Sequence, residues 1–176
     1  MNLNNFTIKS QEAIQKAQEI ALSRQHQAIE KCHLMKGIIS VDENVTPFLF
    51  KKLEVNLPRL SQQVDALLER LPRVSGGGQY LSNDANQVFV KASQLATEMN
   101  DDFVSIEHLL IALLSGNDPT AQALKAAGVG EKALRAAVAD LHEVEGALHE
   151  APAHEELHRH IVDFLFRAVR ILRREE

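Results

Sequence analysis

Histidines and glutamates near the C-terminal end of the chain have the spacing of a zinc site. The run from His154 to His158 matches H-E-x-x-H, which on a helix places two imidazoles on one face with Glu155 beside them as a base. This stretch is rich in His and Glu, so such a match arises easily, and only His149, across a turn, could add a third ligand. Because the motif directly follows a proline break, we assign no metal ligands and expect solvated or interface histidines; a non-catalytic metal site is the alternative.

Two further histidines, His33 and His108, could act as acid–base groups. No serine, cysteine or carboxylate recurs beside both of them, so we interpret them as structural. Cys32 precedes His33, but neighbours on a helix point apart, and no nucleophilic pair is expected. Cys32 is also the only cysteine, which excludes an internal disulfide and is typical of a reducing compartment.

The elements that carry these residues form an internal repeat with a shift of 75 positions. Such a repeat predicts two similar helical modules, each burying an apolar face against its copy. From about His142 onward, nothing matches either copy. The matching segments are Phe6-Thr7 with Leu81-Ser82, Ala17–Ala21 with Ala92–Ala96, and His33–Met35 with His108–Leu110.

Almost every segment has the apolar spacing of a helix, and no segment shows the alternation of a strand. Thr7 and Ser82 are predicted to cap the first helix of each copy. Thr46-Pro47 and Asp118-Pro119 are predicted to start the third helices, since proline is favoured at the first helical position. The other expected helices cover about Lys31–Ser40, Pro58–Leu71 and Ile106–Ser115, with a last one from Glu131.

The sequence thus predicts an all-α protein with two pseudo-symmetric four-helix repeats and a C-terminal helical extension. The double-repeat domain covers 1–141, with repeats at about 6–71 and 81–141. A linker at 72–80 contains three consecutive glycines, which cannot hold a helix. It is expected to be flexible, either as the lip of a binding groove or as a plain spacer. The extension covers 142–176.

Composition excludes several classes of protein. The formal charge is −5 and the basic residues are dispersed, which argues against a nucleic-acid surface. No run approaches the roughly 20 apolar residues of a membrane helix, and no signal peptide is recognisable. We therefore expect a cytoplasmic protein that binds neither nucleic acid nor membrane.

Three motifs in order carry a resemblance to a known family: FTIKSQEAIQKAQEIA from Phe6, EKCHLMKGII from Glu30 and VSIEHLLIALL from Val104. Together they resemble the N-terminal domain of the Clp-family disaggregases, over about residues 1–141. The resemblance implies an eight-helix fold that binds exposed apolar segments of unfolded or aggregated polypeptides beside a ring-forming ATPase motor. It also implies that Thr7, Asp101 and Glu107 surround the binding groove.

Each of these residues also has a structural explanation available. Thr7 can be a helix cap, and Glu107 lies in a first helical turn, where the helix dipole favours an acid. The chain contains no G-x-x-x-x-G-K-[ST] loop for phosphates. We therefore expect no enzymatic activity, no ATP turnover and no cofactor.

The extension has a second helical pattern, after Pro152, whose apolar stripe is too wide for one neighbouring helix. Acids at its start and arginines at its end match the helix dipole, a consistency typical of design, so we suspect that the extension is engineered. The stripe predicts a two-fold homodimer. Its predicted interface residues are Leu157, Ile161, Phe164, Leu165, Ala168, Val169 and Leu172.

Three functions follow as hypotheses. The first is a polypeptide-binding chaperone module. The second is a designed scaffold or assembly protein that dimerises through the extension and has no chaperone role. The third is a metal-dependent hydrolase built on the histidines of the extension.

Overall fold

The computed structural model describes residues 3–74 and 76–150. The chain divides into two compact units, Met1–Val138 and Ala139–Glu176. The H-E-x-x-H run at 154–158 and the predicted dimer interface lie outside the described residues. That interface comprises Leu157, Ile161, Phe164, Leu165, Ala168, Val169 and Leu172.

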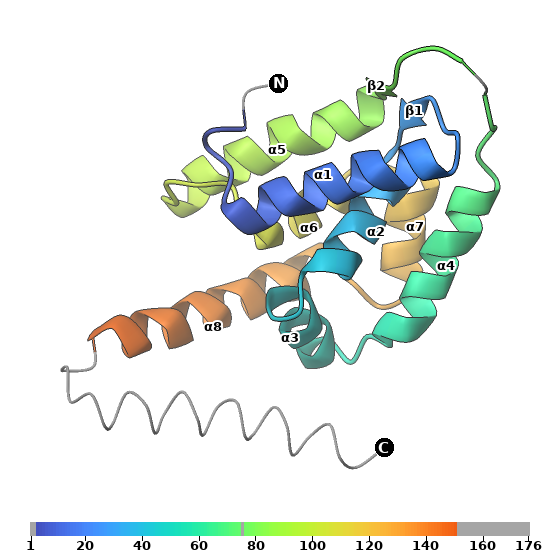
Figure 1. Ribbon diagram of the computed structural model, residues 1–176. Helices are drawn as coiled ribbons and strands as arrows, with labels where there is room; N and C mark the ends of the chain where they lie inside the picture. The colour runs from blue at the N-terminus through green and yellow to red at the C-terminus, as the bar shows by residue number, and fades with distance from the viewer. Residues whose placement is uncertain (1–2, 75, 151–176) are drawn as a thin grey trace. The chain divides into compact units, whose positions relative to one another are not determined.

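Helices make up nearly all regular structure in the described residues, which confirms the all-α prediction (Figure 1). The first repeat contains α1 (Ile8–Ser23), α2 (Lys31–Val41), α3 (Val45–Lys52) and α4 (Leu57–Glu69). The second repeat contains α5 (Asn83–Met99), α6 (Ile106–Leu113), α7 (Pro119–Ala126) and the start of α8 (Glu131–Glu150).

Two short strands were not expected from the sequence. β1 (Ala28–Ile29) pairs in parallel with β2 (Tyr80–Leu81), and Phe6 forms a separate parallel bridge with Val104. Segments of one or two residues are too short to show the alternating pattern by which a strand is recognised.

These pairings follow the internal two-fold of the repeats. The shift of 75 positions carries Phe6 onto Leu81 and Ile29 onto Val104. Phe6 pairs with Val104, and Leu81 pairs with Ile29. Each repeat therefore begins by pairing with the segment that precedes the second helix of the other repeat.

Local capping chemistry explains most of the helix starts. The hydroxyl of Thr7 accepts the amide hydrogen of Ser10 at 3.2 Å, and Ser82 caps α5 in the same way. Asp118 caps α7, with Pro119 at the first helical position as predicted. The helix boundaries differ from the predicted ones by two residues or fewer.

The predicted start of α3 at Thr46-Pro47 is wrong. The helix begins at Val45, with Asn44 in the capping position. Its first amides are held by Asp42, whose carboxylate accepts hydrogen bonds from the amides of Asn44 and Val45 at 3.2 and 3.1 Å and from that of Thr46 at 2.6 Å. A carboxylate further upstream thus takes over the cap, and Thr46 is buried.

The repeats differ in how closely their first two helices pack. A Cβ atom placed on Gly37 in α2 would lie 2.3 Å from the carbonyl oxygen of Ala13 in α1, so these backbones touch. The second repeat has Ala112 and Val88 at the equivalent positions. Both line a cavity of about 270 Å³, which also borders Lys31 of α2.

The linker is attached to the first repeat at its start. The amide of Val74 donates to the carbonyl oxygen of Gln25 at 2.8 Å. Gly76 and Gly77 have φ angles of 85° and 104°, a backbone conformation that favours glycine. The glycines of the linker therefore serve a sharp change of chain direction between α4 and β2.

Candidate functional site

Thr7 is joined to the second repeat by the bridge between Phe6 and Val104. Its amide donates to the carbonyl oxygen of Val104 at 3.0 Å, and the amide of Val104 donates to that of Asn5 at 2.7 Å. The start of α1 is thereby fixed beside the segment 101–107, which contains the other two predicted site residues. The structure thus brings Thr7 next to the chain segment of Asp101 and Glu107.

Asp101 faces a histidine from the same repeat. Its Oδ2 lies 3.0 Å from Nε2 of His108, and its side chain is 33% exposed. His108 itself is fully buried in the first turn of α6. Asp101 is therefore a partly exposed carboxylate beside a buried imidazole.

Glu107 follows Ile106 at the start of α6, in the first turn where the helix dipole favours an acid. Only 8% of Glu107 is exposed, so it offers much less surface to a ligand than Asp101 does. The burial of this residue could not be read from the sequence.

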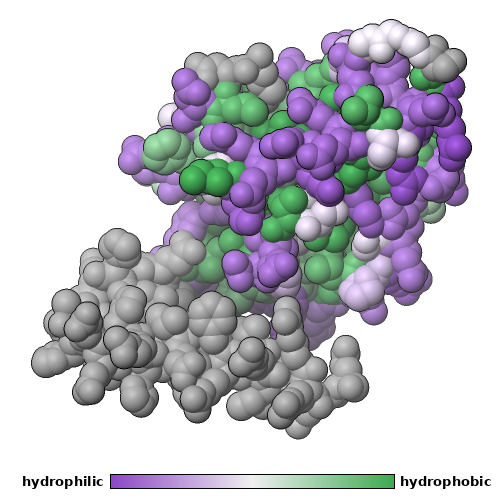
Figure 2. Space-filling view, viewed as in Figure 1, coloured by the Kyte–Doolittle hydropathy of each residue, from purple (hydrophilic) through white to green (hydrophobic). Residues whose placement is uncertain are grey.

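Two apolar side chains near the bridge are exposed. Ile8, directly after Thr7, is 77% exposed, and Phe103, directly before Val104, is 53% exposed. Figure 2 shows apolar side chains reaching the surface as separate patches between polar ones on the face over α1 and α5. We name the set Thr7, Ile8, Asp101 and Phe103 the bridge surface; Glu107 of the same segment is buried. Sequence reasoning missed Ile8 and Phe103, because apolar residues at helix and strand ends are usually buried.

Comparison with known proteins shows the family of this chain. The model of the Clp repeat (R) N-terminal domain matches residues 5–127, well over half of the chain. The chain belongs to the Clp N-terminal domain family.

Two curated relatives carry the name chaperone protein ClpB. The protein of Bacteroides thetaiotaomicron is 50% identical over 145 residues, and that of Porphyromonas gingivalis is 44% identical over 141 residues. These alignments cover 82% and 80% of this chain but only 17% and 16% of the relatives. The chain thus spans about a sixth of the length of the relatives it matches.

Solved structures share the fold at low sequence identity. The N-terminal domain of Hsp104 from Candida albicans matches with a TM-score of 0.70 and 21% identity, over 79% of this chain and 92% of that one. The N-terminal domain of ClpD from Arabidopsis thaliana matches with a TM-score of 0.62 and 22% identity, over 81% and 97%. These likenesses establish the Clp N-terminal fold.

In this Clp N-terminal domain, the two-fold gives the bridge surface a counterpart beside the pairing of β1 with β2. The shift of 75 positions carries Ser82 back to Thr7, His26 to Asp101 and Cys32 to Glu107. The counterpart therefore lacks both carboxylates. Its apolar pair is also absent, since Asn83 and Ala28 stand where Ile8 and Phe103 do.

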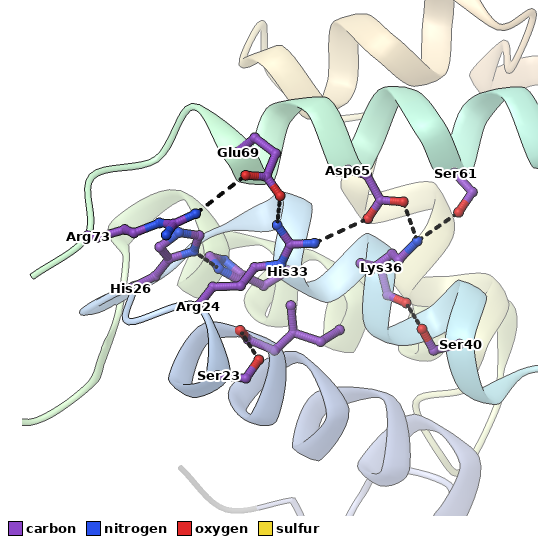
Figure 3. Close-up of polar contacts among 11 residues, drawn as sticks. Ser23, Arg24, His26, His33, Lys36, Ser40, Ser61, Asp65, Glu69 and Arg73 are labelled. Carbon is purple, nitrogen blue, oxygen red and sulfur yellow. Dashed lines mark hydrogen bonds and ion pairs between the residues drawn. The ribbon is translucent and has the colours of Figure 1, made fainter.

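The imidazoles of His26 and His33 form a buried pair in this counterpart (Figure 3). Nδ1 of His26 lies 2.8 Å from Nε2 of His33. Burial lowers the pKa of His33 to about 4, with a smaller effect from His26. Burial also lowers the pKa of His26, and the nearby charges of Arg24 and Arg73 add to this shift. Both imidazoles are therefore neutral near pH 7.

Cys32 and the two capping histidines behave as structural residues. His33 Nδ1 accepts the amide hydrogen of Glu30 at 2.9 Å, and His108 Nδ1 accepts that of Ser105 at 3.0 Å. The Cys32 thiol is buried, which raises its pKa to about 12 and keeps it protonated. These contacts agree with the interpretation of His33 and His108 as structural and give Cys32 no nucleophilic role.

A partly apolar cavity lies between the repeats, with a volume of about 360 Å³. It is bordered by α1 and α5, which the two-fold relates, and by residues 79–81 at the end of the linker. Its apolar lining includes Ile14, Ile29, Leu34, Leu81 and Phe89.

No three His, Cys, Asp or Glu residues in the part of the chain that the structure describes gather closely enough to hold a metal ion. None of its helices combines the length and the apolar character needed to cross a bilayer.

Proposed function

We propose that this domain binds unfolded polypeptide segments at the bridge surface, as the substrate-binding module of a ClpB-type chaperone. The observation that carries the proposal is the exposure of Ile8 and Phe103 on either side of the pairing between Thr7 and Val104. Covering these exposed side chains with apolar residues of an unfolded segment would remove apolar surface from water. Membership of the family supports the same function.

The chemistry of the bridge surface fits a weak, ATP-independent interaction. Two apolar side chains offer contact area to the apolar residues of an unfolded segment, and one carboxylate, Asp101, stays accessible beside them. Burial of a single large apolar side chain contributes about 1.5–3 kcal/mol, much of which is offset by ordering the bound segment. We therefore propose binding without catalysis and without a cofactor.

The test is peptide binding by variants that remove one exposed apolar side chain. Ile8→Ser and Phe103→Ser should each weaken the binding of a fluorescent, unstructured apolar peptide by about five- to ten-fold, given the transfer free energy of such side chains. Leu22→Ser and Val90→Ser are matched controls, because Leu22 and Val90 are 68% and 54% exposed and lie away from the bridge.

Equal losses in all four variants would show that binding is unspecific. No binding by the parent chain at millimolar peptide would contradict the proposed function and favour the scaffold hypothesis.

For the extension, we propose homodimerisation through the apolar stripe of residues 157–172. Its support is the sequence, because an exposed stripe of this width needs a partner. Phe164→Glu should yield monomers in light scattering while the N-terminal domain still unfolds cooperatively. A parent chain that is monomeric at tens of micromolar would contradict the dimer.

A further inference from the structure

We infer that His108 is a positioning residue for polypeptide binding: it fixes the Asp101 carboxylate at the bridge surface so that this group can meet a positive charge on the bound segment. The inference rests on the proposed function and deepens it. It concerns a fully buried residue that no ligand could touch, and it therefore assigns a role that acts through Asp101.

The hydrogen bonding of His108 determines which ring nitrogen carries its proton. Nδ1 lies 3.0 Å from the amide nitrogen of Ser105, and an amide can only donate, so Nδ1 is an acceptor. In the neutral ring the proton must then be on Nε2. The capping contact at the start of α6 thus sets the tautomer.

The proton-bearing nitrogen faces the carboxylate of Asp101. Nε2 of His108 and Oδ2 of Asp101 are 3.0 Å apart and both are buried, but the contact is close without the alignment of a hydrogen bond. The side chain of Asp101 is nevertheless 33% exposed, which leaves Oδ1 as the oxygen that can meet a ligand. One oxygen is therefore held against the imidazole while the other remains available at the surface.

The first repeat shows that capping does not require this carboxylate. His33 accepts the amide hydrogen of Glu30 at 2.9 Å, as His108 does that of Ser105, but its Nε2 faces His26 at 2.8 Å. His26 is the residue equivalent to Asp101. A neutral partner, His26, is thus sufficient for the cap. We therefore assign the carboxylate of Asp101 to the bridge surface.

Two substitutions separate the capping role of His108 from its positioning role. The side-chain oxygen of asparagine can replace Nδ1 as the acceptor for Ser105, but asparagine has no donor where Nε2 lies. The side-chain nitrogen of glutamine can replace Nε2 as the group facing Asp101, and glutamine is also a regular capping-box residue at this third position of a helix. His108→Asn should therefore fold and lose positioning, and His108→Gln should fold and keep positioning.

The experiment compares an unstructured apolar peptide containing one lysine with its norleucine analogue. The parent should bind the lysine peptide roughly three-fold more tightly, the size expected for an exposed pair of opposite charges. Asp101→Asn and His108→Asn should abolish this preference. His108→Gln should keep it, and so should His33→Asn, the matched control in the first repeat.

The outcomes are distinct. Binding of neither peptide by the parent overturns the proposed function itself. If the parent binds and His108→Asn keeps the preference, or if Asp101→Asn keeps it, the positioning role is wrong. Equal loss of binding in His108→Asn and His33→Asn shows a merely structural role and also overturns the inference.

A spectroscopic measurement covers the case in which His108→Asn does not fold. The imidazole ¹⁵N resonances of His108 in the parent chain should show the Nε2-protonated neutral form, and Asp101→Asn should shift the Nε2 resonance. An Nδ1-protonated ring, or an Nε2 resonance that ignores Asp101→Asn, overturns the inference.

Discussion

Each repeat has a histidine at the equivalent position of the cap of its second helix. The two histidines differ in the side chain that lies beside Nε2. His33 faces the imidazole of His26, whereas His108 faces the carboxylate of Asp101. The two repeats therefore have the same backbone contact at this cap, but only the second has an acidic side chain beside its histidine. The comparison shows how a duplicated fold keeps its capping contacts in both copies while only the second copy places a carboxylate beside the capping histidine.

The largest expected difference between the repeats is in helix packing. Gly37→Ala should lower the free energy of unfolding by about 3 kcal/mol, because the new methyl group meets the backbone of Ala13. The reverse change at the equivalent position, Ala112→Gly, should cost about 1 kcal/mol, as expected for glycine within a helix. Urea denaturation of both variants measures this, and equal losses would contradict the closer packing of the first repeat.

Lowering the pH should reduce the free energy of unfolding, because the buried His33 of the first repeat is held in its neutral form. The pKa of His33 falls from 6.5 to about 4 on folding, so the unfolded chain binds more protons between these values. The stabilisation by neutral His33 is thus present above pH 6.5 and is lost as the pH falls towards 4. The parent should lose roughly 2–3 kcal/mol between pH 7 and 4.5 relative to His33→Asn.

Urea unfolding of both proteins at the two pH values measures this difference. Parallel losses in the parent and in His33→Asn would show that His33 is not the group responsible.

The caps of α1 and α5 should be equal in stability and unequal in function. Thr7→Ala and Ser82→Ala should each lower the free energy of unfolding by about 1 kcal/mol, since each hydroxyl caps one helix. Only Thr7 belongs to the bridge surface, so only Thr7→Ala should also weaken peptide binding. A similar loss of binding in Ser82→Ala would mean that both ends of the domain bind.

The smallest effects are expected where α3 and α7 end. Glu54 and Gly128 each directly follow the C-cap residue of their helix, with φ angles of 55° and 98°. Glu54→Gly should therefore stabilise the protein by about 0.5 kcal/mol, and Gly128→Ala should destabilise it by about 1 kcal/mol. Thermal unfolding of both variants measures these effects, and a destabilising Glu54→Gly would show that backbone strain is not the deciding factor.

Local chemistry made much of the fold predictable. The repeat and the caps at Thr7, Ser82 and Asp118 depend on neighbouring residues, so the sequence shows them directly. The predicted start of α3 was wrong because the side chain of Asp42 accepts hydrogen bonds from backbone amides as far along the chain as Thr46. The pairing of Phe6 with Val104 joins residues far apart in the chain and left no local signal.

The candidate site was predictable in part. The family resemblance indicated Thr7, Asp101 and Glu107, and the structure places their chain segments together. The burial of Glu107 and the exposure of Ile8 and Phe103 depend on how the repeats pack. The equivalence of His26 and Asp101 was present in the 75-residue shift, but its meaning required the ring contacts of both histidines.

The most direct test of one-ended binding is a backbone amide NMR titration of the full chain with an unstructured apolar peptide. The bridge surface predicts shifts that concentrate at residues 7–8 and 101–107, with residues 26–32 and 82–83 unchanged. Shifts of equal size at both sets, or shifts confined to residues 26–32 and 82–83, would contradict the claim that polypeptide binds only at the bridge surface.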